Sequence, residues 1–113
     1  MSDQTKQPVT EILTITLKLG TRERFHHLYI TESLPIQKKW KIDVMAHGPS
    51  LHDENIYYVF RSFENLKDMQ EKEDTFYGSD DWQKGPRTAM LSLIEHISTA
   101  VISTEFVKEL FSA

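Results

Sequence analysis

Polar and hydrophobic residues alternate along three stretches of the chain, residues 11–19, 41–47 and 55–63, and this period of two predicts β-strands. On one face of the first stretch the side chains are all apolar: Leu13, Ile15, Leu17 and Leu19. The third stretch is dominated by β-branched and aromatic residues, and both of its faces are apolar enough to be buried. A sheet buried on both faces in so short a chain indicates helices on one side and a partner sheet on the other.

Hydrophobic residues three and four positions apart predict helices between these strands. The first helix is expected to follow Thr21, with its buried side marked by Phe25, Leu28 and Tyr29. We expect this helix to be interrupted at Pro35, because proline cannot continue a helix without a kink.

Two further helices are expected in the second half of the chain. Asn65 is a suitable N-cap for one of them, and Gly85 and Pro86 form a typical start for the other. The buried face of the latter is formed by residues at helical spacing: Met90, Leu93, Ile94 and Ile97. A short last strand is expected over residues 99–103.

The predicted order is β-α-β-β-α-β when the helix after Asn65 is counted in the second crossover, which is the ferredoxin-like arrangement of an α+β protein. Residues 1–9 are polar and are expected to form a disordered tail, and residues 10–113 a single domain. The apolar side chains after residue 105 find no room in a small core, so we expect them to dock on a second subunit.

Composition excludes several classes of function. The chain has 113 residues, no cysteine and a net charge of −4, with acidic and basic residues interleaved. Disulfides, thiolate catalysis and cysteine metal sites are therefore excluded, and nucleic acid is disfavoured as the main partner. No apolar run approaches the roughly 18 residues that span a bilayer, and the N-terminus lacks a signal sequence. We expect a soluble cytoplasmic protein.

Histidines are the first candidates for chemistry. His26 and His27 are neighbours and would point about 100° apart on a helix, so they are poorly placed to chelate one ion. His27 is a candidate for the edge of a pocket. His47, His52 and Asp53 lie around one hairpin connection, where a metal would need a further ligand. We expect hydrogen bonding of the loop or contact with a second subunit there, and no metal and no cofactor.

Large side chains with polar tips are the other candidates, because aromatic walls with a few polar groups are typical of ligand pockets. This group consists of Tyr57, Tyr58, Arg61, Tyr77, Trp82 and Arg87. Arg87 lies at a predicted helix start, where its charge is unfavourable with the helix dipole. Two explanations are open: Arg87 forms an ion pair with Asp80, Asp81 or Glu64, or it belongs to a binding site for an anion. Trp82 belongs to the core or to a pocket. Glu73 is expected to be solvated or ion-paired, so no paired-carboxylate site is expected.

The chain resembles NIPSNAP-domain proteins, which belong to the dimeric α+β barrel superfamily. The resemblance rests on the strand and helix order, the HGPSLHD loop (residues 47–53), the YYVFRSF strand (57–63) and FYGSDDWQKGPR (76–87). It implies an antiparallel four-stranded sheet that pairs with a partner sheet across a two-fold axis, with the helices outside. Relatives in the superfamily include cofactor-independent monooxygenases with a pocket between helices and sheet.

Two hypotheses for the function follow. In the first, the protein is a homodimeric small-molecule-binding protein or a cofactor-independent enzyme of oxygenase type. Its pocket would be lined by His27, Tyr58, Trp82 and Arg87, and an aromatic or anionic ligand would suit those walls. In the second, the protein is a non-catalytic dimeric interaction module in which the same residues only pack and pair.

Overall fold

A four-stranded antiparallel sheet forms the centre of the protein. The computed structural model describes residues 6–112, and the side chains of residues 6–109. The strands are β1 (Val9–Leu17), β2 (Asp43–Pro49), β3 (Ile56–Phe63) and β4 (Ile94–Ser103), in the spatial order β2-β3-β1-β4. The expectations for residues 1–5, and for the side chains of residues 110–113, lie outside the described residues. This strand order confirms the predicted ferredoxin-like arrangement.

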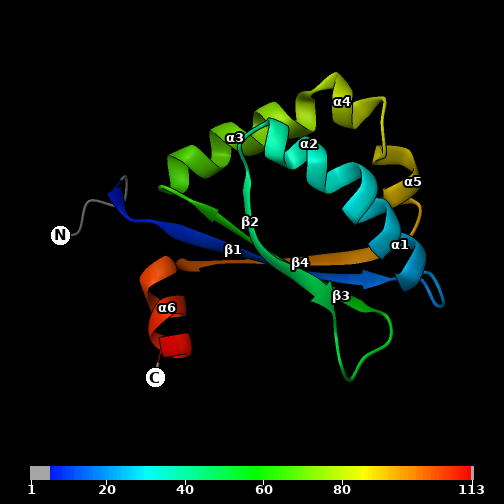
Figure 1. The fold of residues 1–113 in the computed structure, drawn as a ribbon, viewed down its shortest axis with the longest axis horizontal. Coiled ribbons are helices and arrows are strands. Elements are labelled where there is room, and N and C mark those ends of the chain that lie inside the picture. Colours follow the sequence, from blue (N-terminus) through cyan, green and yellow to red (C-terminus); the bar gives the residue numbers. More distant parts are fainter. Residues whose placement is uncertain (1–5, 113) are drawn as a thin grey trace.

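Helices cover one face of this sheet (Figure 1). They are α1 (Arg22–Leu28), the π-helical turn η2 (Tyr29–Ser33), α2 (Leu34–Lys39), α3 (Leu66–Gly78), α4 (Asp80–Gln83) and α5 (Arg87–Leu91). The predicted cap of α3 is present, because the Asn65 side chain accepts a hydrogen bond from the backbone N–H of Asp68 at 2.7 Å. Helix α6 (Thr104–Ser112) lies on the other side of the sheet, against β1 and β4 (Figure 1).

The expected interruption of the first helix at Pro35 was wrong. α1, η2 and α2 follow one another without a break, because the helix widens by one residue before the proline. The Leu34 N–H donates to the Tyr29 carbonyl five positions earlier, which is the hydrogen bond of a π-turn. Pro35 then stands in the first turn of α2, where its missing N–H is not required.

The expected helix up to Ile97 was also wrong, since α5 ends at Leu91 and β4 begins at Ile94. The register between β1 and β4 is irregular at this point: Leu17 lies opposite Ile94, but Thr16 lies opposite His96. Glu95 is therefore an extra residue, a β-bulge, and it places Ile94 and Ile97 on the same face of the sheet. A bulge in a strand thus produced the three-residue spacing that is typical of a helix.

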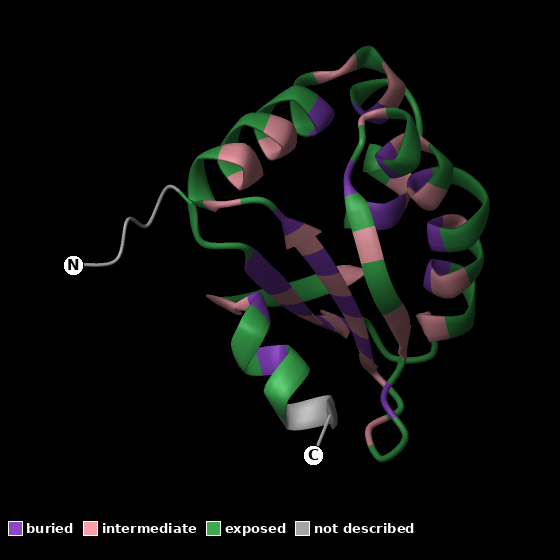
Figure 2. Ribbon diagram, turned by 60° about the vertical axis from the view of Figure 1, so that its left-hand side comes forward, coloured by how far each residue is buried: buried purple, intermediate pink, exposed green. Residues whose placement is uncertain are grey.

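The two faces of the sheet differ in burial (Figure 2). On the face toward the helices, Tyr57, Val59 and Phe63 of β3 are at most 3% exposed. On the opposite face, the apolar side chains of Ile12, Ile56, Tyr58 and Phe60 are only half-buried. Helix α6 covers one end of that face, where the hydroxyls of Thr10 and Thr104 lie 3.0 Å apart. The rest of the face is open, and the pairing of this face with a second sheet stays a prediction.

None of the helices within residues 6–112 has the length and apolar character that crossing a membrane would require.

Candidate functional site

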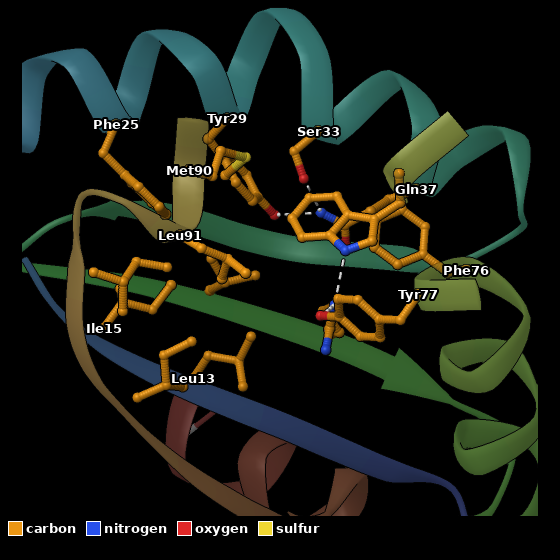
Figure 3. A pocket seen from close by; sticks show the side chains of 15 residues that line it. Leu13, Ile15, Phe25, Tyr29, Ser33, Gln37, Phe76, Tyr77, Met90 and Leu91 are labelled. Carbon is orange, nitrogen blue, oxygen red and sulfur yellow. Dashed lines mark hydrogen bonds between the residues drawn. The ribbon is translucent and has the colours of Figure 1, made fainter. Parts of the chain in front are cut away.

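A cavity lies between the helices and the sheet, near the edge strand β4 (Figure 3). Its volume is about 80 Å³. Leu91 and Ile97, which are 42% and 41% exposed, belong to its lining and form part of the mouth. The other lining residues are Leu13, Ile15, Phe25, Tyr29, Ser33, Gln37, Val59, Arg61, Phe76, Tyr77, Trp82, Met90 and Ile94. Most of these side chains are apolar, so the cavity suits an apolar molecule with a polar group at one end.

The helix that starts at Arg22 contributes one face to this cavity. Phe25, Tyr29, Ser33 and Gln37 follow each other at intervals of four residues, and all four are at most 3% exposed. Tyr29 and Ser33 are the two ends of the π-turn. The turn that accommodates Pro35 therefore also keeps the polar side chains of Tyr29, Ser33 and Gln37 directed toward the sheet (Figure 3).

Arg61, which is 2% exposed, forms the centre of the polar side of the cavity. Its Nε–H donates to Glu11 Oε1 at 2.7 Å, and its Nη2 lies 2.6 Å from the same oxygen and 2.9 Å from Glu73 Oε1. Its Nη1 donates to the Tyr77 hydroxyl at 3.0 Å and to Gln37 Oε1 at 3.3 Å. Four of the five guanidinium N–H bonds therefore donate to acceptors within the protein, and the remaining N–H, on Nη2, is accounted for by the ion-pair contact with Glu11.

Two carboxyls share this single guanidinium. Burial, together with a hydrogen bond to Glu11, raises the pKa of Glu73 to about 8, although the positive charge of Arg61 acts in the opposite direction. The prediction that Glu73 is ion-paired is confirmed, and a second carboxyl, that of Glu11, contacts the same guanidinium.

Gln37 connects the Arg61 network to the helix. Its Oε1 accepts from Arg61, so its Nε2 is the side that donates, at 3.2 Å each, to the Tyr29 and Ser33 hydroxyls (Figure 3). Burial raises the pKa of Tyr29 to about 12, despite the hydrogen bond from Gln37. Tyr29 therefore keeps its hydroxyl proton at neutral pH.

The four residues predicted to line a pocket are not brought together by the fold. Trp82 lines the cavity and is 7% exposed, with its ring centre 5.4 Å from that of Phe76. Tyr58 lies on the opposite face of the sheet, and His27 and Arg87 are exposed and outside the cavity lining. The ion pairs of Asp80 and Asp81 among the described residues are formed with lysines, Lys84 and Lys39, and not with Arg87.

Glu11 was missed as a site residue, and Arg61 was named among the polar-tipped candidates but not selected for the pocket, although the sequence contains a signal for both. Arg61 lies on the same buried face of β3 as Tyr57, Val59 and Phe63, at every second position of the strand. Glu11 lies in the same way among the buried apolar residues of β1. The two residues lie directly opposite each other in the β1–β3 register, where opposite charges stabilise a sheet. A charged residue at a buried position on each of two strands could have indicated a pair.

His47, His52 and Asp53 lie around the connection between β2 and β3, and the hydrogen bonding expected within this loop is present. His47 Nδ1 and His26 Nδ1 lie 3.0 and 2.7 Å from the Tyr57 hydroxyl, and burial lowers the pKa of His47. The Asp53 side chain accepts from the backbone N–H of Asn55 within the loop. Among residues 6–112 there is no group of three or more His, Asp or Glu side chains that could hold a metal ion.

Several solved structures of NIPSNAP-domain proteins have this fold. A NIPSNAP-like domain protein from Burkholderia xenovorans superimposes with a TM-score of 0.79 at 14% identity, covering 86% of this chain and 84% of its own. A NIPSNAP family protein of unknown function from Agrobacterium tumefaciens gives a TM-score of 0.79 at 19% identity, covering 91% and 93%. A putative antibiotic biosynthesis monooxygenase from Caulobacter crescentus gives 0.66 at 10% identity, covering 89% and 92%.

No protein-family model matches the chain, and no curated protein matches it. The identities to the solved structures are low, so these likenesses establish the fold. The resemblance seen in the sequence is thus confirmed at that level: the chain has the ferredoxin-like α+β fold of the NIPSNAP-domain proteins.

Proposed function

We propose that this protein is a NIPSNAP-type protein that binds a small, neutral, largely apolar organic molecule in the cavity between the helices and the sheet. The observation that carries the proposal is the cavity itself, which is apolar on most sides, open beside Leu91 and Ile97 and polar along the Tyr29–Arg61 network. Arg61 has no N–H left for an anion and is flanked by two carboxyls, so the geometry favours a neutral ligand over an anionic one.

The size of the cavity limits the ligand. An engineered apolar cavity of roughly 150 Å³ binds benzene, and the cavity here measures about 80 Å³. A molecule with one aromatic ring would therefore place part of its surface in the mouth, against Leu91 and Ile97. Ligands larger than this would require the mouth to widen.

The working form in this proposal is a homodimer in which the open sheet faces pack together. The half-buried Ile12, Ile56, Tyr58 and Phe60 supply an apolar surface for that contact. A partner sheet on this face leaves the cavity on the opposite face accessible. Like the dimer, a cytoplasmic location stays a prediction.

A cofactor-independent oxygenase is the second candidate. It is favoured by the likeness in fold to the putative monooxygenase and by two titratable carboxyls beside the cavity. The interaction-module hypothesis would require the cavity to stay empty while the dimer forms.

The test uses toluene as an apolar probe and the indole N–H signal of Trp82 in two-dimensional NMR as the readout. We expect toluene to shift the Trp82 signal in a saturable way, because Trp82 is part of the cavity wall. Leu91→Trp partly fills the mouth and is expected to abolish this shift. Leu66→Trp is the matched control, since Leu66 is also 42% exposed at a helix end but lies outside the cavity.

If toluene leaves the Trp82 signal unchanged, or if Leu91→Trp and Leu66→Trp bind it equally well, the proposed function is wrong. If the dimer forms in the same samples, the interaction module becomes the better explanation.

A further inference from the structure

The hydrogen bonds around the cavity use up acceptors and leave the hydroxyls of Tyr29 and Ser33 as donors. Arg61 donates to Gln37, and Gln37 donates to the oxygens of Tyr29 and Ser33. A hydroxyl that accepts such a bond still has its own proton to donate. The direction of the chain from Arg61 through Gln37 thus fixes Tyr29 as a donor.

Tyr29 is the donor best placed to meet a ligand. Its side chain is 3% exposed and lines the cavity, and no acceptor for its hydroxyl proton is found among the described residues. Tyr77 accepts from Arg61 in the same way, but it is 38% exposed, so water can satisfy its hydroxyl. Burial of an unused donor costs free energy, and a ligand acceptor would remove that cost.

The surrounding charges decide which acceptor is suitable. Glu11 and Glu73 both form ion pairs with Arg61. A carboxylate ligand would add a negative charge beside these two carboxyls, and no guanidinium N–H is free to bind it. A hydroxyl or amino group would bring a donor to a place where the nearby acceptors are already in use. An oxygen that only accepts satisfies Tyr29 without adding charge.

We propose that the ligand carries a neutral carbonyl oxygen, as in a small aryl or alkyl ketone or a quinone, and that the Tyr29 hydroxyl donates to it. Polarisation along the chain from Arg61 through Gln37 strengthens Tyr29 as a donor. This inference rests on the proposed function, because it specifies the polar group of a molecule that binds in the same cavity.

The test compares three probes of similar size: acetophenone, α-methylstyrene and benzoate. In α-methylstyrene a CH₂ group replaces the carbonyl oxygen, and benzoate supplies an anion. Acetophenone labelled with ¹³C at the carbonyl is expected to show a downfield shift on binding relative to its position in an apolar solvent. Benzoate is expected not to displace it.

Tyr29→Phe is the informative variant, and Tyr77→Phe is the control with the same loss of one hydroxyl. Tyr29→Phe is expected to weaken acetophenone by roughly 2- to 10-fold, the value of one net hydrogen bond. It is expected to remove the ¹³C shift and leave α-methylstyrene binding unchanged. Tyr77→Phe is expected to retain the ¹³C shift.

The outcomes separate the two proposals. If α-methylstyrene binds but bound acetophenone shows no hydrogen-bond shift, or if Tyr29→Phe keeps that shift, the cavity is a binding site and the carbonyl inference is overturned. Preferential binding of benzoate overturns it as well. If none of the probes binds, the proposed function fails and this inference fails with it. The ¹³C shift in the wild-type protein decides the question even if Tyr29→Phe does not fold.

Discussion

Replacing Arg61 by methionine tests the buried network most severely. Methionine fills much of the same space but removes all five N–H donors, and it leaves Glu11 and Glu73 without a positive charge. Both carboxyls are largely buried, with side-chain exposures of 5% and 17%. Removal of one partner from a buried ion pair costs about 3–5 kcal/mol. We expect a loss in this range for Arg61→Met at pH 8.

The pH dependence of that loss is the sharper measurement. In the wild-type protein one carboxyl, Glu73, already holds a proton up to about pH 8. Without the guanidinium, Glu11 must also take up a proton to stay buried. Each carboxyl that is protonated only in the folded state lowers stability by about 1.4 kcal/mol per pH unit as pH rises. The difference between variant and wild type should therefore grow from pH 5 to pH 8.

Urea unfolding at a fixed protein concentration, followed by circular dichroism, measures both quantities. A double variant, Arg61→Met with Glu11→Leu, is the control. It removes a buried charge together with its main partner and should recover part of the stability lost at pH 8. A loss below about 1 kcal/mol for Arg61→Met, with the same pH slope as the wild type, would refute the existence of a closed buried network.

Four further predictions follow from the same contacts. Trp82→Ala should lower the free energy of unfolding by about 3–5 kcal/mol, because the indole is buried in the core; a loss below about 1 kcal/mol would place it at the surface. Gly85→Ala should destabilise the protein by about 1–3 kcal/mol in urea unfolding, because a Cβ there would collide with the Asp81 carbonyl oxygen. Phe60→Glu should convert a dimer into a monomer in sedimentation velocity, and a monomeric wild-type protein would count against the paired sheets. Glu73→Gln should flatten the pH dependence of stability: the raised pKa of Glu73 makes the wild-type protein lose stability as pH rises from about 4.5 to about 8, and an unchanged slope in the variant would contradict the assignment.

The strand pattern was predictable from the sequence because alternation in β1 and β3 reports burial directly. In β3, Tyr57 and Val59 face the helices and Tyr58 and Phe60 the open side, as the pattern indicated. β4 was not predictable over its full length. The start of this strand contains a β-bulge at Glu95. The extra residue changes the spacing of the inward-facing side chains from two residues to three, as between Ile94 and Ile97.

The candidate site was less predictable than the fold. Trp82 was identified because a large apolar side chain is unfavourable in solvent and is therefore expected in the core or in a pocket. Glu11 was overlooked, and Arg61 was named without being selected for the pocket, because each is unfavourable at a buried position alone. Only the pairing of β1 with β3 brings them together. Gln37 could not be recognised either, since the expected break at Pro35 removed it from the helix that presents Tyr29.

A crystal structure of the protein grown with acetophenone tests the central claim most directly. The account predicts density between the helices and the sheet, in contact with Trp82, with the ketone oxygen within about 3 Å of the Tyr29 hydroxyl. An empty cavity at saturating acetophenone, or a dimer in which shifted side chains fill that space, would contradict it.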